Sequence, residues 1–269
     1  MRFKHVHTFS GVALAACVLA GATAVSGPAA AADLAAPTVR SPDDLPAPQV
    51  RRATPLPKAS PSAEERSQAG SATPALPGVG PQHMADLPAD TTQVLIASTP
   101  KTGDDDARIA FYTLDDGRWR EERSFKGHNA VKGWTDTSKK REGDLRTPAG
   151  VFALTDAGGY LPDPGTKMPY TRDRSLKNGA AGAYGPRYAN VFDYVLAINY
   201  NRKTGVSPNE KTRPQGWDKG GGIWLHLDHD DGTHGCVTLK RADLKWVLRQ
   251  LDPQASPQII MGAAPDIAK

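Results

Sequence analysis

Short apolar runs recur along the chain from about Thr92 to its C-terminal end. They lie at 94–97, 150–154, 194–200 and 258–261, are rich in Val, Leu, Ile and aromatic residues, and are separated by loops containing Gly and Pro. Runs of this length and composition predict β-strands. Two further runs, 108–114 and 119–125, flank the turn residues Asp116 and Gly117 and predict a β-hairpin.

Two later segments have a clear period. In 223–227 the apolar residues alternate, so a strand would place Ile223, Leu225 and Leu227 on one face and Trp224 and His226 on the other. Segment 241–251 instead has the helical spacing i, i+3, i+4, i+7 at Leu244, Val247, Leu248 and Leu251. Because strands outnumber this helix, the pattern predicts a mainly β domain with one helix packed on it.

The N-terminal third has a different character. Residues 1–32 combine Arg2 and Lys4 with an apolar run and an Ala-rich end before Asp33, which predicts a secretory signal peptide. Leu14–Cys17 also resembles a lipobox, which leaves lipid anchoring through Cys17 as an alternative. We therefore expect a secreted protein of the cell envelope, with no transmembrane segment after cleavage, because no later run approaches the roughly 20 apolar residues that a membrane helix needs.

Residues 33–90 are rich in Pro, Ala, Ser and Thr and poor in large apolar side chains. This composition predicts a disordered linker. The folded domain is then expected at 91–264. The formal net charge of +4 is spread among acidic residues, so nothing in the sequence indicates a nucleic-acid partner.

The chemistry is concentrated in 224–238. This segment holds three of the seven histidines and Cys236, the cysteine that remains after signal cleavage. A thiol becomes a good nucleophile when an imidazole or another cationic neighbour promotes loss of its proton. His226, across the loop from Cys236, and His234, two positions before it, are the candidates. N–H groups around Gly235 are placed to stabilise an oxyanion.

Thr233-His-Gly-Cys-Val237 resembles the Ser/Thr-His-Gly-Cys signature of the YkuD-type L,D-transpeptidases, with His226 in the place of that family's upstream histidine. Asp144–Phe152 is similar to the Thr-Pro-x-Gly-x-Phe segment of the same domains. The resemblance implies a β-sandwich with a short packed helix, in which Cys236 accepts the acyl group and His226 is the base. It also implies that His234 takes part in catalysis and that Thr233, Gly235 and Trp224 form the oxyanion and substrate pocket.

The implied reaction is a two-step acyl transfer between peptidoglycan stem peptides, without metal or other cofactor, by a protein expected to be monomeric. Water as acceptor would make the enzyme an L,D-carboxypeptidase. Two departures from the family pattern affect specificity. Thr238 stands where the family usually has Arg or Asn, and ten positions separate His226 from Cys236, fewer than in most members.

Other interpretations remain open. His226-Leu-Asp-His229 resembles half of a metallo-β-lactamase motif, although Trp224 occupies the position of the leading histidine. A noncatalytic wall-binding module would keep the fold and tolerate loss of the thiol. His229 lies among aspartates and is expected to be solvated, and the 144–152 segment, including Arg146, is expected to form a turn leading into a strand.

Overall fold

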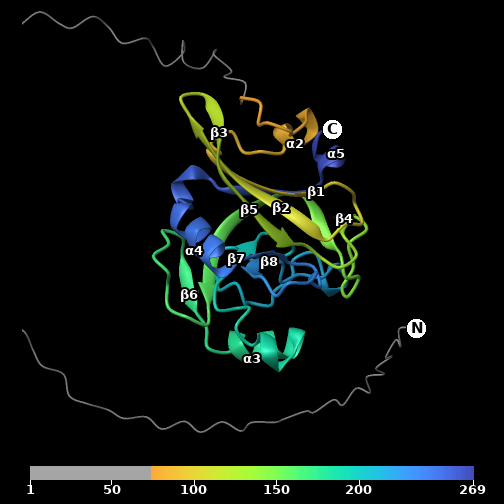
Figure 1. Cartoon of the computed structure of the whole chain (residues 1–269), viewed down its shortest axis with the longest axis vertical. Helices are drawn as coiled ribbons and strands as arrows, with labels where there is room; N and C mark the ends of the chain where they lie inside the picture. The colour runs from red at the N-terminus through yellow and green to blue at the C-terminus, as the bar shows by residue number, and fades with distance from the viewer. Residues whose placement is uncertain (1–73) are drawn as a thin grey trace, which may run out of the picture. The chain divides into compact units, whose positions relative to one another are not determined.

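The computed structural model describes residues 74–269, which form one 10-stranded sheet with short helices around it (Figure 1). The strand order is β3-β2-β1-β10-β5-β7-β8-β9, with β4 and β6 paired to β5. The strands are β1 Gln93–Thr99, β2 Asp106–Asp115, β3 Arg118–His128, β4 Trp134–Asp136, β5 Thr147–Gly159, β6 Tyr170–Arg172, β7 Val195–Ile198, β8 Trp224–Leu227, β9 Val237–Leu239 and β10 Gln258–Ala263. The α-helices are α2 Pro81–Ala85, α3 Leu176–Tyr184, α4 Arg241–Gln250 and α5 Ala264–Ile267, and the 3₁₀ turns are η1 Pro186–Tyr188, η2 Trp217–Lys219 and η3 Pro253–Ala255.

The prediction of a mainly β domain is confirmed, as is the hairpin. Strands β2 and β3 pair antiparallel up to Asp115 and Arg118. The two residues between them, Asp116 and Gly117, both have positive φ, at 47° and 71°. That conformation gives the tight turn whose twist matches that of the flanking strands.

The two edges of the sheet meet, so the sheet is nearly closed. The backbone N–H of His128, at the end of β3, donates to Thr238 Oγ1 of β9 at 2.8 Å. A Cβ on Gly127 would lie 1.9 Å from the carbonyl oxygen of Thr238, so only glycine allows this approach. The strand that follows Cys236 is thereby fixed against the opposite edge of the sheet.

The predicted helix is α4, which packs against the sheet (Figure 1). Its apolar stripe, Leu244, Val247 and Leu248, is fully buried in the main core together with Leu225 and Leu227 of β8. Burying one such side chain stabilises the fold by roughly 1.5–3 kcal/mol. The face of β8 that was predicted to be apolar is therefore held against the core, and Trp224 and His226 point the other way.

The folded region begins earlier than predicted. Residues 74–90 were assigned to a disordered linker, but Leu76 and Leu87 are buried in a second apolar cluster with Trp119 and Ile267. The indole of Trp119 also donates to the carbonyl of Pro74 at 2.9 Å. Residues 74–90 thus pack on the domain through two leucines and the Pro74 carbonyl. The average composition of 33–90 gives no sign of this packing.

Three predicted features lie outside the described residues: the signal peptide at 1–32, the alternative anchor at Cys17, and residues 33–73 of the linker. None of the helices within residues 74–269 has the length and apolar character that crossing a bilayer requires. Helix α3, whose last residue Tyr184 lies at the candidate site, was not predicted from the sequence.

Candidate active site

Cys236 immediately precedes β9 and lies beside Trp224 of β8. The two strands run parallel, with Leu225 opposite Val237, so the preceding residues Trp224 and Cys236 are neighbours. The N–H of Trp224 donates to the sulfur at 3.4 Å, and the thiol donates to the carbonyl of Gly222 at 3.5 Å. Burial raises the pKa of Cys236 to about 11. The resting sulfur is therefore a neutral thiol.

The sulfur is buried but has a route to a ligand. Cys236 lines a cavity of about 590 Å³, which is within the usual size range of small-molecule sites. Charged side chains of Lys140, Glu142, Lys211 and Arg213 line the same cavity. A polar peptide can therefore reach the thiol while meeting groups of both charges.

His226 is fully buried on β8, on the same face as Trp224. Its Nδ1 lies 2.9 Å from the carbonyl oxygen of Leu227. Because a carbonyl can only accept, Nδ1 carries the proton and Nε2 keeps a free lone pair. Burial lowers the pKa of His226 to about 3, so the imidazole is neutral and its Nε2 can accept a hydrogen bond.

The Nε2 atom of His226 is occupied by a tyrosine hydroxyl. The hydroxyl of Tyr184, the last residue of α3, lies 3.4 Å from His226 Nε2. Burial raises the pKa of Tyr184, and the nearby Cys236 raises it further. The hydroxyl is therefore protonated and donates a hydrogen bond to Nε2. Among the described residues, the hydrogen-bond partners of the sulfur are Trp224 and Gly222, and His226 is not one of them. The expected pair thus occupies neighbouring strands without a direct hydrogen bond in this conformation.

His234 is exposed and stacks on Tyr184, with the ring centroids 5.0 Å apart and an interplanar angle of 27°. It lines the cavity together with Cys236. Because His234 stacks on the ring of Tyr184, the two side chains together lie between His226 and the solvent.

Thr233 holds the turn that precedes the cysteine. Its hydroxyl donates to the carbonyl of Cys236 at 2.7 Å and accepts the N–H of Gly235 at 3.0 Å. It is fully buried and is not among the residues that line the cavity. The expectation of a substrate contact is therefore replaced by a structural role, because both hydrogen-bonding capacities of the hydroxyl are used by the backbone. Gly235 does line the cavity and packs closely under Ile223.

Trp224 also lines the cavity, where its ring packs edge-on against Phe192. It is only 6% exposed, and its indole N–H has no hydrogen-bond partner within residues 74–269. A buried donor without a partner is costly, but this N–H is enclosed by protein and is not open to the cavity. The substrate-binding role of Trp224 stays a prediction.

The expectation for His229 is wrong. Its side chain is 7% exposed and lies against Tyr184, with centroids 4.5 Å apart, and against His226 at 5.9 Å. Burial lowers the pKa of His229 as well. The aspartates around it suggested a solvated loop, but α3 folds over that loop and covers it.

Arg146 has the structural role that was expected. Its guanidinium donates to the carbonyls of Lys132 and Trp134, at 2.5 and 3.3 Å. Asp144 just before it accepts from buried Lys140 at 2.6 Å, and the charge of Lys140 lowers the pKa of Cys236, against the larger effect of burial. Asp144 therefore holds Lys140, just outside the segment, whose positive charge acts on the thiol and was not predicted from the sequence.

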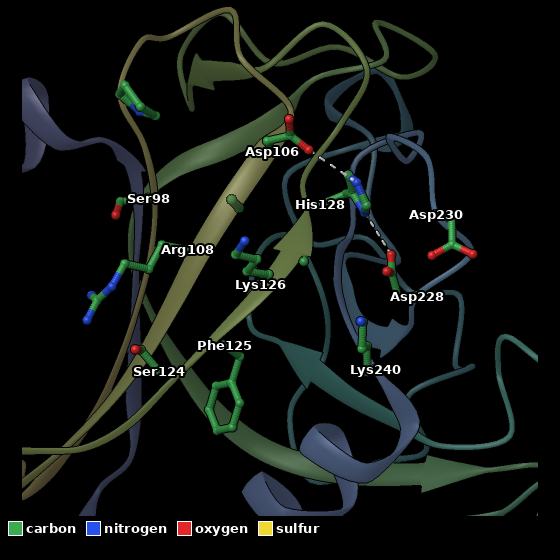
Figure 2. A pocket seen from close by; sticks show the side chains of 13 residues that line it. Ser98, Asp106, Arg108, Ser124, Phe125, Lys126, His128, Asp228, Asp230 and Lys240 are labelled. Atoms are coloured by element: carbon green, nitrogen blue, oxygen red, sulfur yellow. Dashed lines mark hydrogen bonds and ion pairs between the residues drawn. The ribbon is translucent and has the colours of Figure 1, made fainter.

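Thr238, at the position of the family's usual Arg, is fully buried. Its hydroxyl donates to Asp228 Oδ1 at 2.7 Å. Burial favours the protonated form of Asp228, but hydrogen bonds from Thr238 and His128 outweigh it and keep the pKa low. Figure 2 shows His128 between Asp228 and Asp106, at 2.8 and 3.3 Å. Here Thr238 contributes to closing the sheet.

Asp106, His128 and Asp228 border a second cavity of about 750 Å³ (Figure 2), which shares no lining residue with the cavity at Cys236. Its charged residues include Arg108, Lys126 and Lys240. Within the part of the chain that the structure describes, no group of three or more His, Cys, Asp or Glu is arranged to hold a metal ion.

A buried cysteine that lines a cavity of mixed charge, with a buried, neutral histidine on the adjacent strand of a nearly closed sheet, defines a candidate cysteine–histidine enzyme site. The family model described as the L,D-transpeptidase catalytic domain, YkuD, matches residues 104–260, and the chain belongs to this family. The fold expected from the resemblance is therefore confirmed. Domains of this family act on peptidoglycan.

Among solved structures, the chain is similar to Bd1075 of Bdellovibrio bacteriovorus, with 16% identity and a TM-score of 0.34 over 63% of this chain and 47% of that one. The chain thus spans about half of that solved chain. A comparison with curated proteins finds no match.

Proposed function

We propose that the protein is an exported L,D-transpeptidase that acts on peptidoglycan stem peptides through a thioester on Cys236. One observation carries the proposal: the Cys236 thiol lines the cavity just before β9, the strand that pairs with β8, which carries neutral His226 with its Nδ1–H held by the Leu227 carbonyl. An imidazole whose Nε2 can accept a proton once the Tyr184 hydroxyl moves away, and a thiol that lines a cavity, are the two parts that covalent acyl transfer needs.

In the first step, the thiol proton passes to His226 Nε2 and the sulfur forms a bond to the carbonyl carbon of the third stem residue. The tetrahedral intermediate then expels the terminal D-alanine as its amine, which takes the proton back from Nε2. In the second step, the amine of another stem attacks the thioester, transfers its proton to Nε2, and the thiol is regenerated.

The Tyr184 hydroxyl has to move away from His226 before the thiol proton can be transferred. This hydroxyl occupies His226 Nε2 at 3.4 Å, where the thiol proton must arrive. Tyr184 ends α3 and is followed by Gly185, whose φ of 98° few other residues adopt easily. A shift of this helix end on substrate binding would uncover Nε2 and complete the site.

Binding would draw on the groups around the thiol. The ring of Trp224 lines the cavity beside the thiol and offers an apolar surface to the peptide. Lys211 offers positive charge to a substrate carboxylate, whereas Arg213 and Glu142 pair with each other at 2.7 Å.

The test is incubation with a synthetic tetrapeptide stem, followed by intact-protein mass spectrometry and product analysis. The expected result is a covalent adduct on Cys236, release of D-alanine, and a cross-linked dimer. Cys236→Ala should abolish both adduct and product, with a loss on the order of 10⁴-fold. His226→Gln should prevent adduct formation, whereas His234→Gln, which changes an exposed ring of the same type, should leave it measurable. Turnover by Cys236→Ala would refute the mechanism, and free tripeptide in place of dimer would make the enzyme a carboxypeptidase.

Export is the second part of the proposal and is supported by the sequence of residues 1–32 alone. N-terminal sequencing of the protein from its natural host should find a chain that starts at or near Asp33. A chain that starts at a lipidated Cys17 would replace soluble export with membrane anchoring.

A further inference from the structure

Trp217 is an exposed tryptophan close to the proposed active site. Within residues 74–269 the exposed large apolar side chains are Val131, at 40%, and Trp217, at 62%. Single exposed apolar residues are ordinary on protein surfaces, so exposure alone indicates nothing. What distinguishes Trp217 is how firmly its ring and its backbone are held.

One face of the indole is backed by an arginine. The guanidinium carbon of Arg213 lies 4.5 Å from the centroid of the Trp217 ring. Arg213 is itself fixed, because its Nη1 pairs with Glu142 Oε2 at 2.7 Å and only 13% of its side chain is exposed. The indole is thus supported from behind, and most of its surface is left to solvent.

The backbone of the turn is held as firmly. The side-chain amide of Asn201 donates to the carbonyls of Gly216 and Gly220, on either side of η2, at 2.9 and 2.5 Å. The N–H of Glu142 donates to the carbonyl of Asp218 at 2.8 Å. A rigid aromatic surface loses little entropy when a ligand binds to it, which favours a role in recognition.

The same residues connect this surface to the thiol. Arg213 and Glu142 line the cavity that contains Cys236. After η2 the chain continues to Gly222, whose carbonyl accepts a hydrogen bond from the Cys236 thiol at 3.5 Å. Trp217 therefore stands beside the cavity, and Arg213 contacts both.

We infer that Trp217, backed by Arg213, is a stacking platform for an amino-sugar ring of the peptidoglycan glycan strand. This inference rests on the proposed function. With its third residue at Cys236, an extended stem peptide reaches about 10 Å toward its sugar, so the ring lies outside the cavity at its edge. A flat indole suits the C–H face of a sugar, and Asp218 and Lys219 beside it offer partners for hydroxyl and acetamido groups.

The experiment compares two donor substrates, a free tetrapeptide and the same tetrapeptide attached to its disaccharide, by the kcat/KM for D-alanine release. Trp217→Ala should lower the value for the disaccharide substrate by about fivefold to tenfold and leave the free peptide unchanged. Trp217→Phe should recover most of the loss. Val131→Ala, at the other exposed apolar side chain, should change neither. Equal loss on both substrates, or loss on neither, would overturn the inference.

A binding measurement separates this inference from the proposed function. The disaccharide without peptide is titrated into the wild type and into Trp217→Ala by calorimetry. If the wild type releases no D-alanine but binds the disaccharide and the variant does not, the catalytic proposal fails and the platform stands. If neither protein binds the disaccharide and the two have equal kcat/KM on the disaccharide substrate, the platform fails.

Discussion

The burial of His226 makes protein stability depend on pH in a way that can be calculated. Its folded-state pKa is lowered from 6.5 to about 3 by burial, so the folded protein resists protonation that the unfolded chain accepts. Stability is intact above the unfolded pKa of 6.5 and is lost as the pH falls toward 3. Between pH 7 and pH 5, the unfolded state gains about 2 kcal/mol from protonating this one imidazole.

The assay is urea unfolding at pH 7.0 and pH 5.0, followed by tryptophan fluorescence. His226→Gln should remove about 2 kcal/mol of the wild-type loss between the two pH values. The pKa of His229 is also lowered by burial, so the difference between wild type and variant isolates His226. His234→Gln, which removes an exposed imidazole, is the matched control and should behave as wild type. If His226→Gln loses as much stability as the wild type, the imidazole is not buried and neutral, and the base assigned above is wrong.

Three further predictions test the surroundings of the thiol. Because the pKa of Cys236 is about 11, its alkylation rate with iodoacetamide should rise tenfold per pH unit up to about pH 10. The rate of an ordinary thiol levels off near pH 8.5, so a plateau there would contradict the burial of Cys236. Tyr184→Phe keeps the ring that stacks on His234 but frees His226 Nε2, so kcat should be equal or higher, and a tenfold fall would mean that the hydroxyl relays the proton. Thr233→Val leaves two backbone groups without a partner and should cost about 2 kcal/mol in urea unfolding, while Thr233→Ser should cost much less.

The fold was largely predictable because its main elements have strong local periods. The alternation in β8 and the stripe on α4 both signal a face that must be buried, and both faces meet in the same core. The edges of the folded region were not predictable in the same way. Leu76 and Leu87 have no period of their own, and only the surface formed by Trp119 and Ile267 gives them a place to pack.

Some residues of the candidate site were predictable from the sequence and others were not. Cys236 and His226 could be found because a rare reactive side chain and its base lie within one short segment. Tyr184 could not, because it comes 42 positions before His226 and nothing in the local sequence of α3 places it beside that histidine. Thr233 was assigned to the substrate by its place in the motif, whereas its hydroxyl is used to hold the turn.

By itself, the sequence determined which candidate side chains lie together in one short segment and which face of β8 turns to the core, since both depend on residue type and on spacing along the chain. The tertiary structure alone decided that His226 is buried and neutral, that the Leu227 carbonyl leaves Nε2 free, and that Tyr184 covers it. The physical reason is that protonation and access are set by every group packed around an atom, and those groups come from parts of the chain that only folding brings together.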